Sequence, residues 1–377
     1  MRDATGRGIK AGVVDLLGQP LDEPLDDDAF NRIAVRIFQF QYARNRPYAA
    51  FCDRRGVTPE SVALWTDIPA VPTAAFKEVA LVAGDPAEAE AVFRTSGTTQ
   101  GLEKRGAHHI LDLALYHFAL IPNFAACVLP DGAEMPMLSL VPSSTEMPDS
   151  SLAHMVGVVL ERLGSRESGY FATASHGIDD GRLATALRAA AESGTPVCLV
   201  GTSFAFVHCL DRMRERGERH DLPPASRIMD TGGYKGRSRE VDEAEMRQLY
   251  GEFLGIPASH CVNEYGMTEM CSQFYDSSLR DSVRGRERDR RKLVPPWVRT
   301  RVVDPETLEP VSPGTTGLLQ HFDLANVGSV MAIQTEDLGV ALDEGFQLLG
   351  RAPGAMPRGC SIAMDMLLEA VGQQQRR

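Results

Sequence analysis

Short apolar runs alternate with helical periodicity through the middle of the chain. Buried strands are predicted at 137–143, 169–174, 196–203, 227–233 and 260–266. Helices are predicted between and after them, at 151–163, 179–192, 204–216 and 240–253. This alternation is typical of βαβ units around a largely parallel sheet. We therefore predict an α/β core.

The pattern differs on both sides of this core. Asp26 to Asp28 can cap a helix that runs to about residue 45. From about residue 293 the segments are short, β-rich and separated by Pro/Gly turns, before a last helix at about 361–371. We expect four parts: an N-terminal helical segment (1–88), the α/β core (89–292), a β-rich subdomain (293–350) and a short C-terminal turn and helix (351–377).

Composition narrows the class of protein. A net charge of −12 argues against a general nucleic-acid binder, which would show a basic footprint. No apolar run reaches the 18 or so residues of a membrane span, and the N-terminus lacks the apolar core of a signal peptide. The seven cysteines form no C-x-x-C pair, which argues against a zinc site, and their odd number in a cytoplasmic chain indicates reduced thiols. A cytoplasmic protein is expected.

Polar turns follow several of the predicted strands. RTSGTTQGLEKRG (94–106) follows a strand at 89–93 and precedes a helix at about 112–121. Its glycines, hydroxyls and backbone N–H groups can surround phosphate oxygens. It is not a Walker A loop, and an ordinary polar loop without a ligand is the alternative interpretation. DTGGYK and EYGMTE end two further strands. Ligands of parallel sheets bind beyond such strand ends, so we expect the three turns to converge.

Five motifs, taken together, resemble a known superfamily: RTSGTTQG, DTGGYKGR, EYGMTE, TEDLG and GRAPGAMPRG. Their order and spacing resemble the adenylate-forming enzymes (acyl-CoA synthetases, luciferases and adenylation domains), and most of all the acyl-protein synthetases of bacterial bioluminescence. The resemblance covers about residue 89 to the C-terminus. It implies the large N-terminal-type domain of the superfamily, with parallel-rich sheets flanked by helices and a small β subdomain.

The same resemblance implies an ATP- and magnesium-dependent ligase. A carboxylate attacks the α-phosphorus of ATP, which gives an acyl-adenylate and pyrophosphate. The acyl group of a hydrophobic or aromatic acid then forms a thioester with Cys360, a carrier protein or a partner enzyme such as a reductase. In-line attack of one anion on another depends mainly on positioning and charge neutralisation, which polar turns can supply.

Site residues follow from the resemblance one at a time. The phosphate loop corresponds to Thr95, Ser96, Gly97, Thr98 and Thr99. Gly232 and Gly233 correspond to the turn against which adenine and the substrate lie, and Tyr265 to the aromatic residue that stacks on adenine. Tyr265 also fits an ordinary core position.

The remaining assignments concern the reacting phosphate and the ribose. Thr268 corresponds to the hydroxyl near the α-phosphate and Glu269 to the magnesium ligand, a hard oxygen donor suited to that ion. Asp337 corresponds to the carboxylate that binds the ribose hydroxyls, and Arg351 to the basic residue beside it. Glu269 as a surface acid and Asp337 as a turn cap are the alternatives.

The chain departs from the superfamily after Arg351, where no lysine follows. We expect the C-terminal domain, with its catalytic lysine, to be truncated or absent. Lys235 is our candidate replacement because a point charge there would neutralise developing phosphate charge, with Lys104 as the second choice. An exposed loop lysine is the alternative for Lys235.

Cys360 lies where the resemblance places an acyl-accepting cysteine, at the start of the last helix. A helix N-terminus and nearby Arg358 would lower the pKa of its thiol and favour the nucleophilic thiolate. A structural cysteine is the alternative.

Other features stay open at this point. His108 and His109 either contact ATP phosphates or open the next helix, and His176 is a weak candidate for the acyl pocket. The basic run 280–292 is expected to be a mobile solvated loop, with a lid or docking surface as alternatives. A non-catalytic nucleotide- or acyl-binding protein is the alternative function, and an enzyme that stops at the adenylate is a third.

Overall fold

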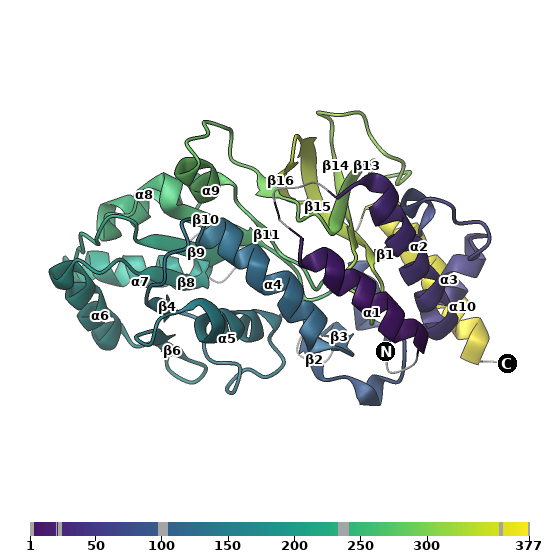
Figure 1. The fold of residues 1–377 in the computed structure, drawn as a ribbon, viewed down its shortest axis with the longest axis horizontal. Coiled ribbons are helices and arrows are strands. Elements are labelled where there is room, and N and C mark those ends of the chain that lie inside the picture. Colours follow the sequence, from purple (N-terminus) through teal and green to yellow (C-terminus); the bar gives the residue numbers. More distant parts are fainter. Residues whose placement is uncertain are drawn as a thin grey trace. The chain divides into compact units, whose positions relative to one another are not determined.

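A computed structural model describes residues 4–19, 21, 25–96, 105–232, 241–353 and 357–375 (Figure 1). Contacts between Cα atoms divide the chain into two compact units. Unit 1 comprises Met1–Leu120, Met267–Ser272 and Leu293–Arg377, and unit 2 comprises Ile121–Gly266 and Gln273–Lys292. The four parts expected from the sequence stay a prediction.

Unit 2 is built on a six-stranded sheet of order β11-β10-β9-β8-β4-β5, in which only β11 runs antiparallel to its neighbour. Its strands are β4 (Met137–Ser139), β5 (Gly169–Tyr170), β8 (Cys198–Thr202), β9 (Arg227–Thr231), β10 (Cys261–Tyr265) and β11 (Phe274–Tyr275). The predicted parallel α/β sheet is thereby confirmed.

Helices connect these strands: α5 (Ser151–Leu163), α6 (Asp180–Ser193), α7 (Ser203–Arg216), α8 (Glu243–Leu254) and, after β11, α9 (Ser278–Val283). Their ends follow from local sequence. α8 begins where the Asp242 carboxylate accepts a 2.7 Å hydrogen bond from the Glu245 N–H, and it ends at Gly255, whose φ is +67°. The apolar faces of α6, α7 and α8 form a core with β4, β8 and β9 through residues such as Leu187, Phe206 and Tyr250.

The predicted strand 169–174 is broken into two. β5 ends at Tyr170, and β6 (Ala172–Thr173) pairs instead with β7 (Gly177–Ile178). The physical reason is visible at Phe171, whose N–H donates to Ser139 while its carbonyl accepts from the Asp179 N–H. The chain therefore leaves the main sheet there.

Unit 1 contains a second, mostly antiparallel sheet of order β12-β16-β15-β14-β13, to which β1 adds in parallel beside β15. Its strands are β1 (Val71–Pro72), β12 (Lys292–Leu293), β13 (Val298–Val303), β14 (Thr316–Asp323), β15 (Ala332–Leu342) and β16 (Gly345–Arg351). The small β subdomain of the expected fold is thereby present.

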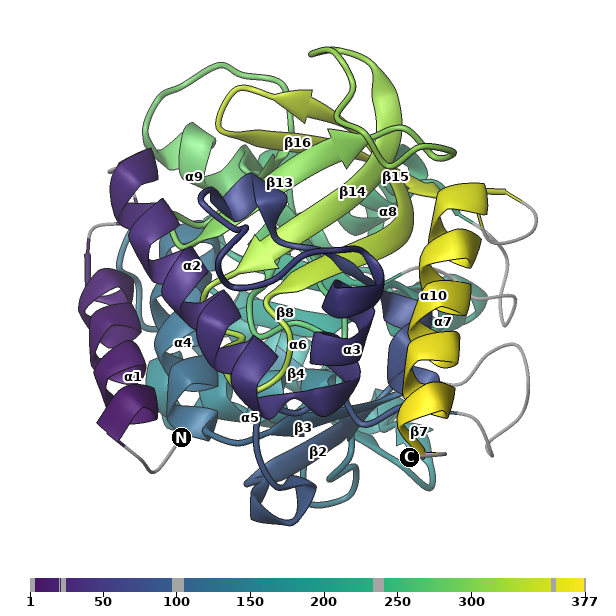
Figure 2. The same cartoon turned by 90° about the vertical axis from the view of Figure 1, so that its right-hand side faces the viewer.

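Helices lie beside this sheet (Figure 2). They are α1 (Ala4–Leu17), α2 (Asp27–Arg44), α3 (Arg46–Arg54) and α10 (Arg358–Gln375), with 3-10 turns η1 (Trp65–Asp67), η2 (Thr73–Lys77) and η3 (Pro86–Glu88). η5 (Ala258–His260) belongs to unit 2. Among the described helices, none combines the length and the apolarity needed to cross a bilayer.

The strand before the phosphate loop is not part of the parallel sheet, so that expectation was wrong. β2 (Ala91–Arg94) pairs in antiparallel register with β3 (Ala107–Ile110), and the two form a separate hairpin in unit 1. His108 and His109 lie in β3 and do not open the next helix, α4 (Leu113–Val128). Residues 107–110 pair with β2 before any helix begins.

The basic run was also interpreted incorrectly at its C-terminal end. Arg286 is exposed as expected, but Lys292 is 3% exposed and forms a 3.1 Å ion pair with Asp276. Arg290 bonds the other oxygen of the same carboxylate at 2.6 Å. A buried acid thus draws the end of the run into unit 2.

Candidate active site

The base of the phosphate loop is closed by Thr95 in unit 1. Its N–H donates to the Gly106 carbonyl, and its Oγ1 accepts from the Gly106 N–H, both at 2.9 Å. Arg105 donates through Nε to the Thr95 carbonyl at 2.5 Å. Ser96 is exposed beyond this closure. Gly97, Thr98, Thr99 and Lys104 lie outside the described residues, so their assignment stays a prediction.

In unit 2, the turn after β9 begins at Thr231 and Gly232. Gly232 has a φ of +79°, a left-handed conformation that favours glycine. The Thr231 hydroxyl donates to the buried Glu264 carboxylate at the end of β10. This bond joins the two neighbouring strand ends that carry the DTGG and EYG motifs. Gly233 and Lys235 lie outside the described residues.

Glu264 fills the space beside the turn that follows β10. A Cβ atom at Gly266 would lie 2.2 Å from Glu264 Oε1, so any other residue there would displace this carboxylate. Burial raises the pKa of Glu264 to about 7, and the hydrogen bond from Thr231 opposes this shift. The carboxyl group therefore changes its charge near neutral pH, directly before Tyr265.

Tyr265, the residue expected to stack on adenine, ends β10. It is 9% exposed, and its ring centroid lies 5.7 Å from that of Phe274 with the planes tilted by 32°. Part of the ring is thus packed against β11, as the alternative core position requires. The stacking role stays a prediction.

A buried polar cluster lies on β9 and β10. Asp230 accepts hydrogen bonds from the Tyr250 hydroxyl at 2.8 Å and from the Asn263 amide at 2.9 Å. Burial raises the pKa of Asp230, whereas Asn263, Tyr250 and Lys292 lower it. Lys292 donates to the Asn263 carbonyl at 2.8 Å. The cluster therefore links β9 and β10, the strands that precede the two glycine-containing turns.

Thr268 and Glu269, at the end of the EYGMTE motif, belong to unit 1. The Thr268 carbonyl lies 2.7 Å from His108 Nδ1, and the Glu269 carbonyl accepts from Asn326 Nδ2 at 2.9 Å. Glu269 is 7% exposed. Within the described ranges, no group of three or more His, Cys, Asp or Glu residues could hold a metal ion alone.

β15 brings three of the predicted site residues together in unit 1. Asp337 is registered opposite Arg351 of β16. Arg351 donates through Nε and Nη2 to Glu336, at 3.1 and 2.6 Å, and so pairs with the residue before Asp337. On the other side of Glu336, the Cys360 thiol donates to the Thr335 carbonyl at 3.8 Å. Cys360 therefore lies beside the strand segment that carries the predicted ribose-binding carboxylate.

The thiol of Cys360 does not have the predicted low pKa. It is 1% exposed and packs with Val303 and Leu318. Burial, with a smaller contribution from Glu336, raises its pKa to about 12. Our expectation of a thiolate was wrong because burial disfavours the charged form of the thiol and Glu336 adds to the rise.

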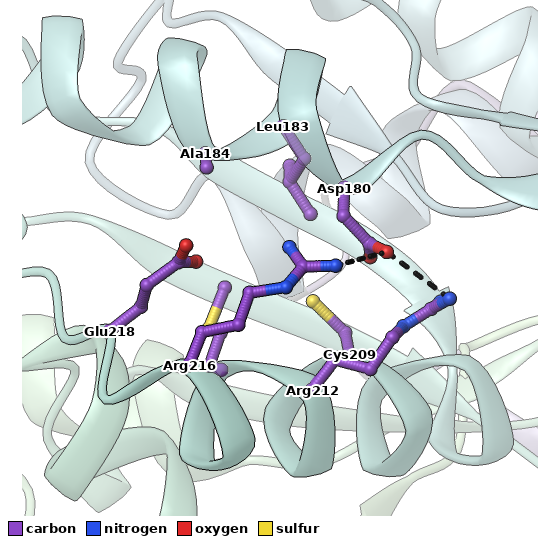
Figure 3. Close-up of a pocket in the computed structure, with 8 residues that line it drawn as sticks. Asp180, Leu183, Ala184, Cys209, Arg212, Arg216 and Glu218 are labelled. Atoms are coloured by element: carbon purple, nitrogen blue, oxygen red, sulfur yellow. Dashed lines mark hydrogen bonds and ion pairs between the residues drawn. The ribbon is translucent and has the colours of Figure 1, made fainter.

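One small pocket between α6 and α7 in unit 2 contains none of these residues (Figure 3). Asp180 accepts from both Arg212 and Arg216 there, each at 3.1 Å. Acid and bases thus compensate one another within the pocket.

The sequence did not reveal the residues that hydrogen-bond to the site motifs from other parts of the chain. His108 was noticed only because it follows the phosphate loop, and neither Asn326 nor Glu264 was singled out as a site residue. Glu264 is the first residue of the EYGMTE motif, in which only Tyr265, Thr268 and Glu269 received roles.

Comparison with known proteins identifies relatives over nearly the whole chain. Residues 14–369 match the family described as "Acyl-protein synthetase, LuxE". A long-chain-fatty-acid–luciferin-component ligase of Vibrio harveyi is 25% identical over 351 residues, 90% of this chain and 88% of its own. The ligase of the same description from Aliivibrio fischeri is 24% identical over 353 residues, with the same shares covered.

A solved structure shares the fold. An open conformation of 2-hydroxyisobutyryl-CoA ligase, in complex with 2-HIB-AMP and CoA, superposes with a TM-score of 0.62 at 14% sequence identity. The match covers 88% of this chain and 74% of that ligase. The adenylate-forming fold predicted from the sequence is confirmed.

Proposed function

Because the chain belongs to the acyl-protein synthetase family, and is thereby an AMP-forming ligase that activates a carboxylic acid as its adenylate, we propose that its acid is a long-chain fatty acid and its acyl acceptor Cys360. The relatives from Vibrio harveyi and Aliivibrio fischeri, described by this acid, support the first point. The non-catalytic alternative is set aside with the family assignment.

The observation that carries the assignment of Cys360 is the contact of its thiol, from α10, with β15. Its thiol donates to the carbonyl of Thr335, two residues from Asp337, the proposed ribose ligand. An adenylate whose ribose is bound by Asp337 would therefore be bound by the same strand, β15, that the Cys360 thiol contacts.

Two steps make up the reaction. A carboxylate oxygen attacks the α-phosphorus of ATP, the bond to the β-phosphate breaks, and pyrophosphate leaves. The Cys360 sulfur then attacks the acyl carbon, the bond to AMP breaks, and the thiol proton passes to solvent. A second protein accepts the acyl group from this thioester. We place the reaction in the cytoplasm, where ATP and reduced thiols occur together.

Individual residues serve the first step. Thr95, Ser96, Gly97, Thr98 and Thr99 would surround the outer phosphates, and Thr268 the α-phosphate. Gly232, Gly233 and Tyr265 would hold adenine, Asp337 and Arg351 the ribose side, and Lys235 would neutralise phosphate charge. Glu269 would hold Mg²⁺, whose remaining ligands would be phosphate and water oxygens; the ion supplies charge neutralisation when bound.

The second step requires a change at Cys360. The thiol is covered and protonated, so it cannot act as a nucleophile while α10 packs on Val303 and Leu318. The first turn of α10 must therefore move before acyl transfer.

Intact-protein mass spectrometry tests the acceptor. Wild type, Cys360→Ala and Cys52→Ala are incubated with ATP, Mg²⁺ and fatty acids of different length. Cys52 is a matched control because it is buried and its pKa is also raised to about 12. We expect a hydroxylamine-labile acyl mass in wild type and Cys52→Ala and none in Cys360→Ala. An acyl mass that persists in Cys360→Ala would contradict the assignment.

Pyrophosphate exchange tests the first step separately. Glu269→Gln and Lys235→Ala should each lower the exchange rate at least about 100-fold, because each loses charge stabilisation of the reacting phosphate. Exchange near the wild-type rate in both variants would refute these two roles. It would leave the acceptor question untouched.

A further inference from the structure

His108 of β3 contacts the backbone of Thr268, the residue proposed to lie near the α-phosphate. It is 1% exposed, and its Nδ1 lies 2.7 Å from the Thr268 carbonyl oxygen. Its Nε2 lies 3.0 Å from Asn326 Oδ1, and its ring centroid lies 5.6 Å from that of Phe76 with the two planes nearly perpendicular. Both ring nitrogens therefore face protein atoms, and the ring has no nitrogen left for a nucleotide.

The orientation of Asn326 is set by its other contacts. Its Nδ2 donates to the carbonyls of Glu269 and Val330, each at 2.9 Å. Rotating the amide by 180° would place Oδ1 against both carbonyls, so Oδ1 must face His108. His108 and Asn326 together thus hold the carbonyls of two consecutive residues, Thr268 and Glu269.

Protons can be assigned in this network. Burial lowers the pKa of His108 to about 4, although its contacts with Thr268 and Asn326 act to raise it, so the ring carries one N–H at neutral pH. The Thr268 carbonyl and Asn326 Oδ1 both accept, so the single N–H serves only one of them. The contact with Thr268 is the shorter one, which places the N–H on Nδ1 and leaves no hydrogen bond between Nε2 and Asn326 Oδ1. Asn326 Oδ1 receives the thiol hydrogen of Cys271, whose sulfur lies 3.6 Å away.

We propose that His108, supported by Asn326, is a positioning residue for acid activation, which holds the Thr268–Glu269 backbone so that both side chains face the nucleotide. This inference rests on the proposed function, because it takes Thr268 and Glu269 as the residues beside the α-phosphate and the magnesium ion. The contact with Thr268 is the one that matters for the reaction. A misplacement of about 1 Å at a reacting centre can cost about 100-fold in rate.

Two isosteric variants separate this role from simple packing. In His108→Asn, the side-chain nitrogen replaces Nδ1 and keeps the bond to Thr268. In His108→Gln, it replaces Nε2, keeps the contact with Asn326 and loses the bond to Thr268. His321 of β14 is the matched control, since it is also fully buried in unit 1, bonds Thr300 at 2.9 Å and lies beside the ring of Phe346, neither of which is a proposed site residue.

We would measure kcat and KM for ATP in pyrophosphate exchange, the Kd of ATP with Mg²⁺ by calorimetry, and the thermal midpoint of each variant. His108→Gln should lower kcat at least about tenfold, and His108→Asn less than about threefold. The asparagine and glutamine variants of His321 should lower the thermal midpoint similarly without changing kcat. Equal kcat values for the two His108 variants, or losses no greater than in the His321 variants, would overturn the proposal.

The same measurements distinguish failure of the positioning role from failure of the proposed function. Wild type that binds ATP but shows no exchange would refute acid activation. In that case, ATP binding at least about tenfold weaker in His108→Gln than in His108→Asn would support the positioning role, and equal Kd values would overturn it. Wild type that neither binds nor exchanges would overturn both. If neither His108 variant folds, Asn326→Ser should lower kcat at least about tenfold relative to Asn45→Ser, a control at another buried asparagine; equal values would overturn the proposal.

Discussion

Replacing Lys292 with methionine should destabilise unit 2, because it leaves a buried acid without its lysine. Lys292 lies 3.1 Å from Asp276, whose side chain is 3% exposed. Breaking a buried ion pair by removing one partner costs about 3–5 kcal/mol. Arg290 still bonds Asp276 at 2.6 Å, so we expect the lower end, about 3 kcal/mol.

Urea unfolding followed by circular dichroism measures this loss, and hydrogen exchange of peptides covering β10 locates it. Arg286→Met is the control, since it removes an exposed base from the same run and should change the free energy of unfolding by less than about 0.5 kcal/mol. Adding Asp276→Asn to Lys292→Met should restore more than half of the loss. Equal losses in the Lys292 and Arg286 variants would refute the reasoning.

The pair also predicts a dependence on pH. Burial alone would raise the pKa of Asp276, but Lys292 and Arg290 outweigh it and hold the pKa below its ordinary value of 3.8. A depressed carboxyl pKa contributes stability that is present above pH 3.8 and is lost as the pH falls through the folded-state value. Lys292→Met should weaken this acid-induced loss of stability, and a loss as steep as that of wild type would contradict the assignment.

Two further predictions concern groups at the candidate active site. A thiol whose pKa is raised from 9.0 to about 12 has about 1,000-fold less thiolate, so iodoacetamide should label Cys360 at least about 1,000 times more slowly than free cysteine at pH 8; a rate within tenfold of free cysteine would show that the thiol is not covered. Because the pKa of Glu264 is raised from 4.5 to about 7, the folded state binds its proton more tightly, and the free energy of unfolding should fall as the pH rises through this range. Differential scanning calorimetry between pH 4.5 and 8 should show a steeper fall in wild type than in Glu264→Gln, because Asp323, whose pKa is raised to about 6, titrates in both. The same fall in both would exclude Glu264 as a source.

Much of unit 2 could be predicted from the sequence because its signals are local. Helical periodicity placed α5 at 151–163, the bounds that the structure has, and apolar runs located β8, β9 and β10. A helix forms from contacts three and four residues apart, and its caps are neighbours in sequence. The hairpin of β2 and β3 was missed because strand pairing depends on where the chain returns after a loop.

The motifs by themselves indicated the superfamily, the chemistry and the positions of Thr268, Glu269, Asp337, Arg351 and Cys360. Motifs report residue type and order, which suffice to suggest acid activation by ATP. They do not report burial, because the neighbours that exclude water come from distant parts of the chain.

Only the tertiary structure determined the state of several of these side chains. It showed that Cys360 is covered by Val303 and Leu318 and that its pKa is raised rather than lowered. It also placed His108 beside Asn326, 218 residues away in sequence, where the two hold consecutive carbonyls of the EYGMTE motif. Charge state and hydrogen-bond partners depend on the local dielectric and on distances of a few ångströms, and these exist only once the chain has folded.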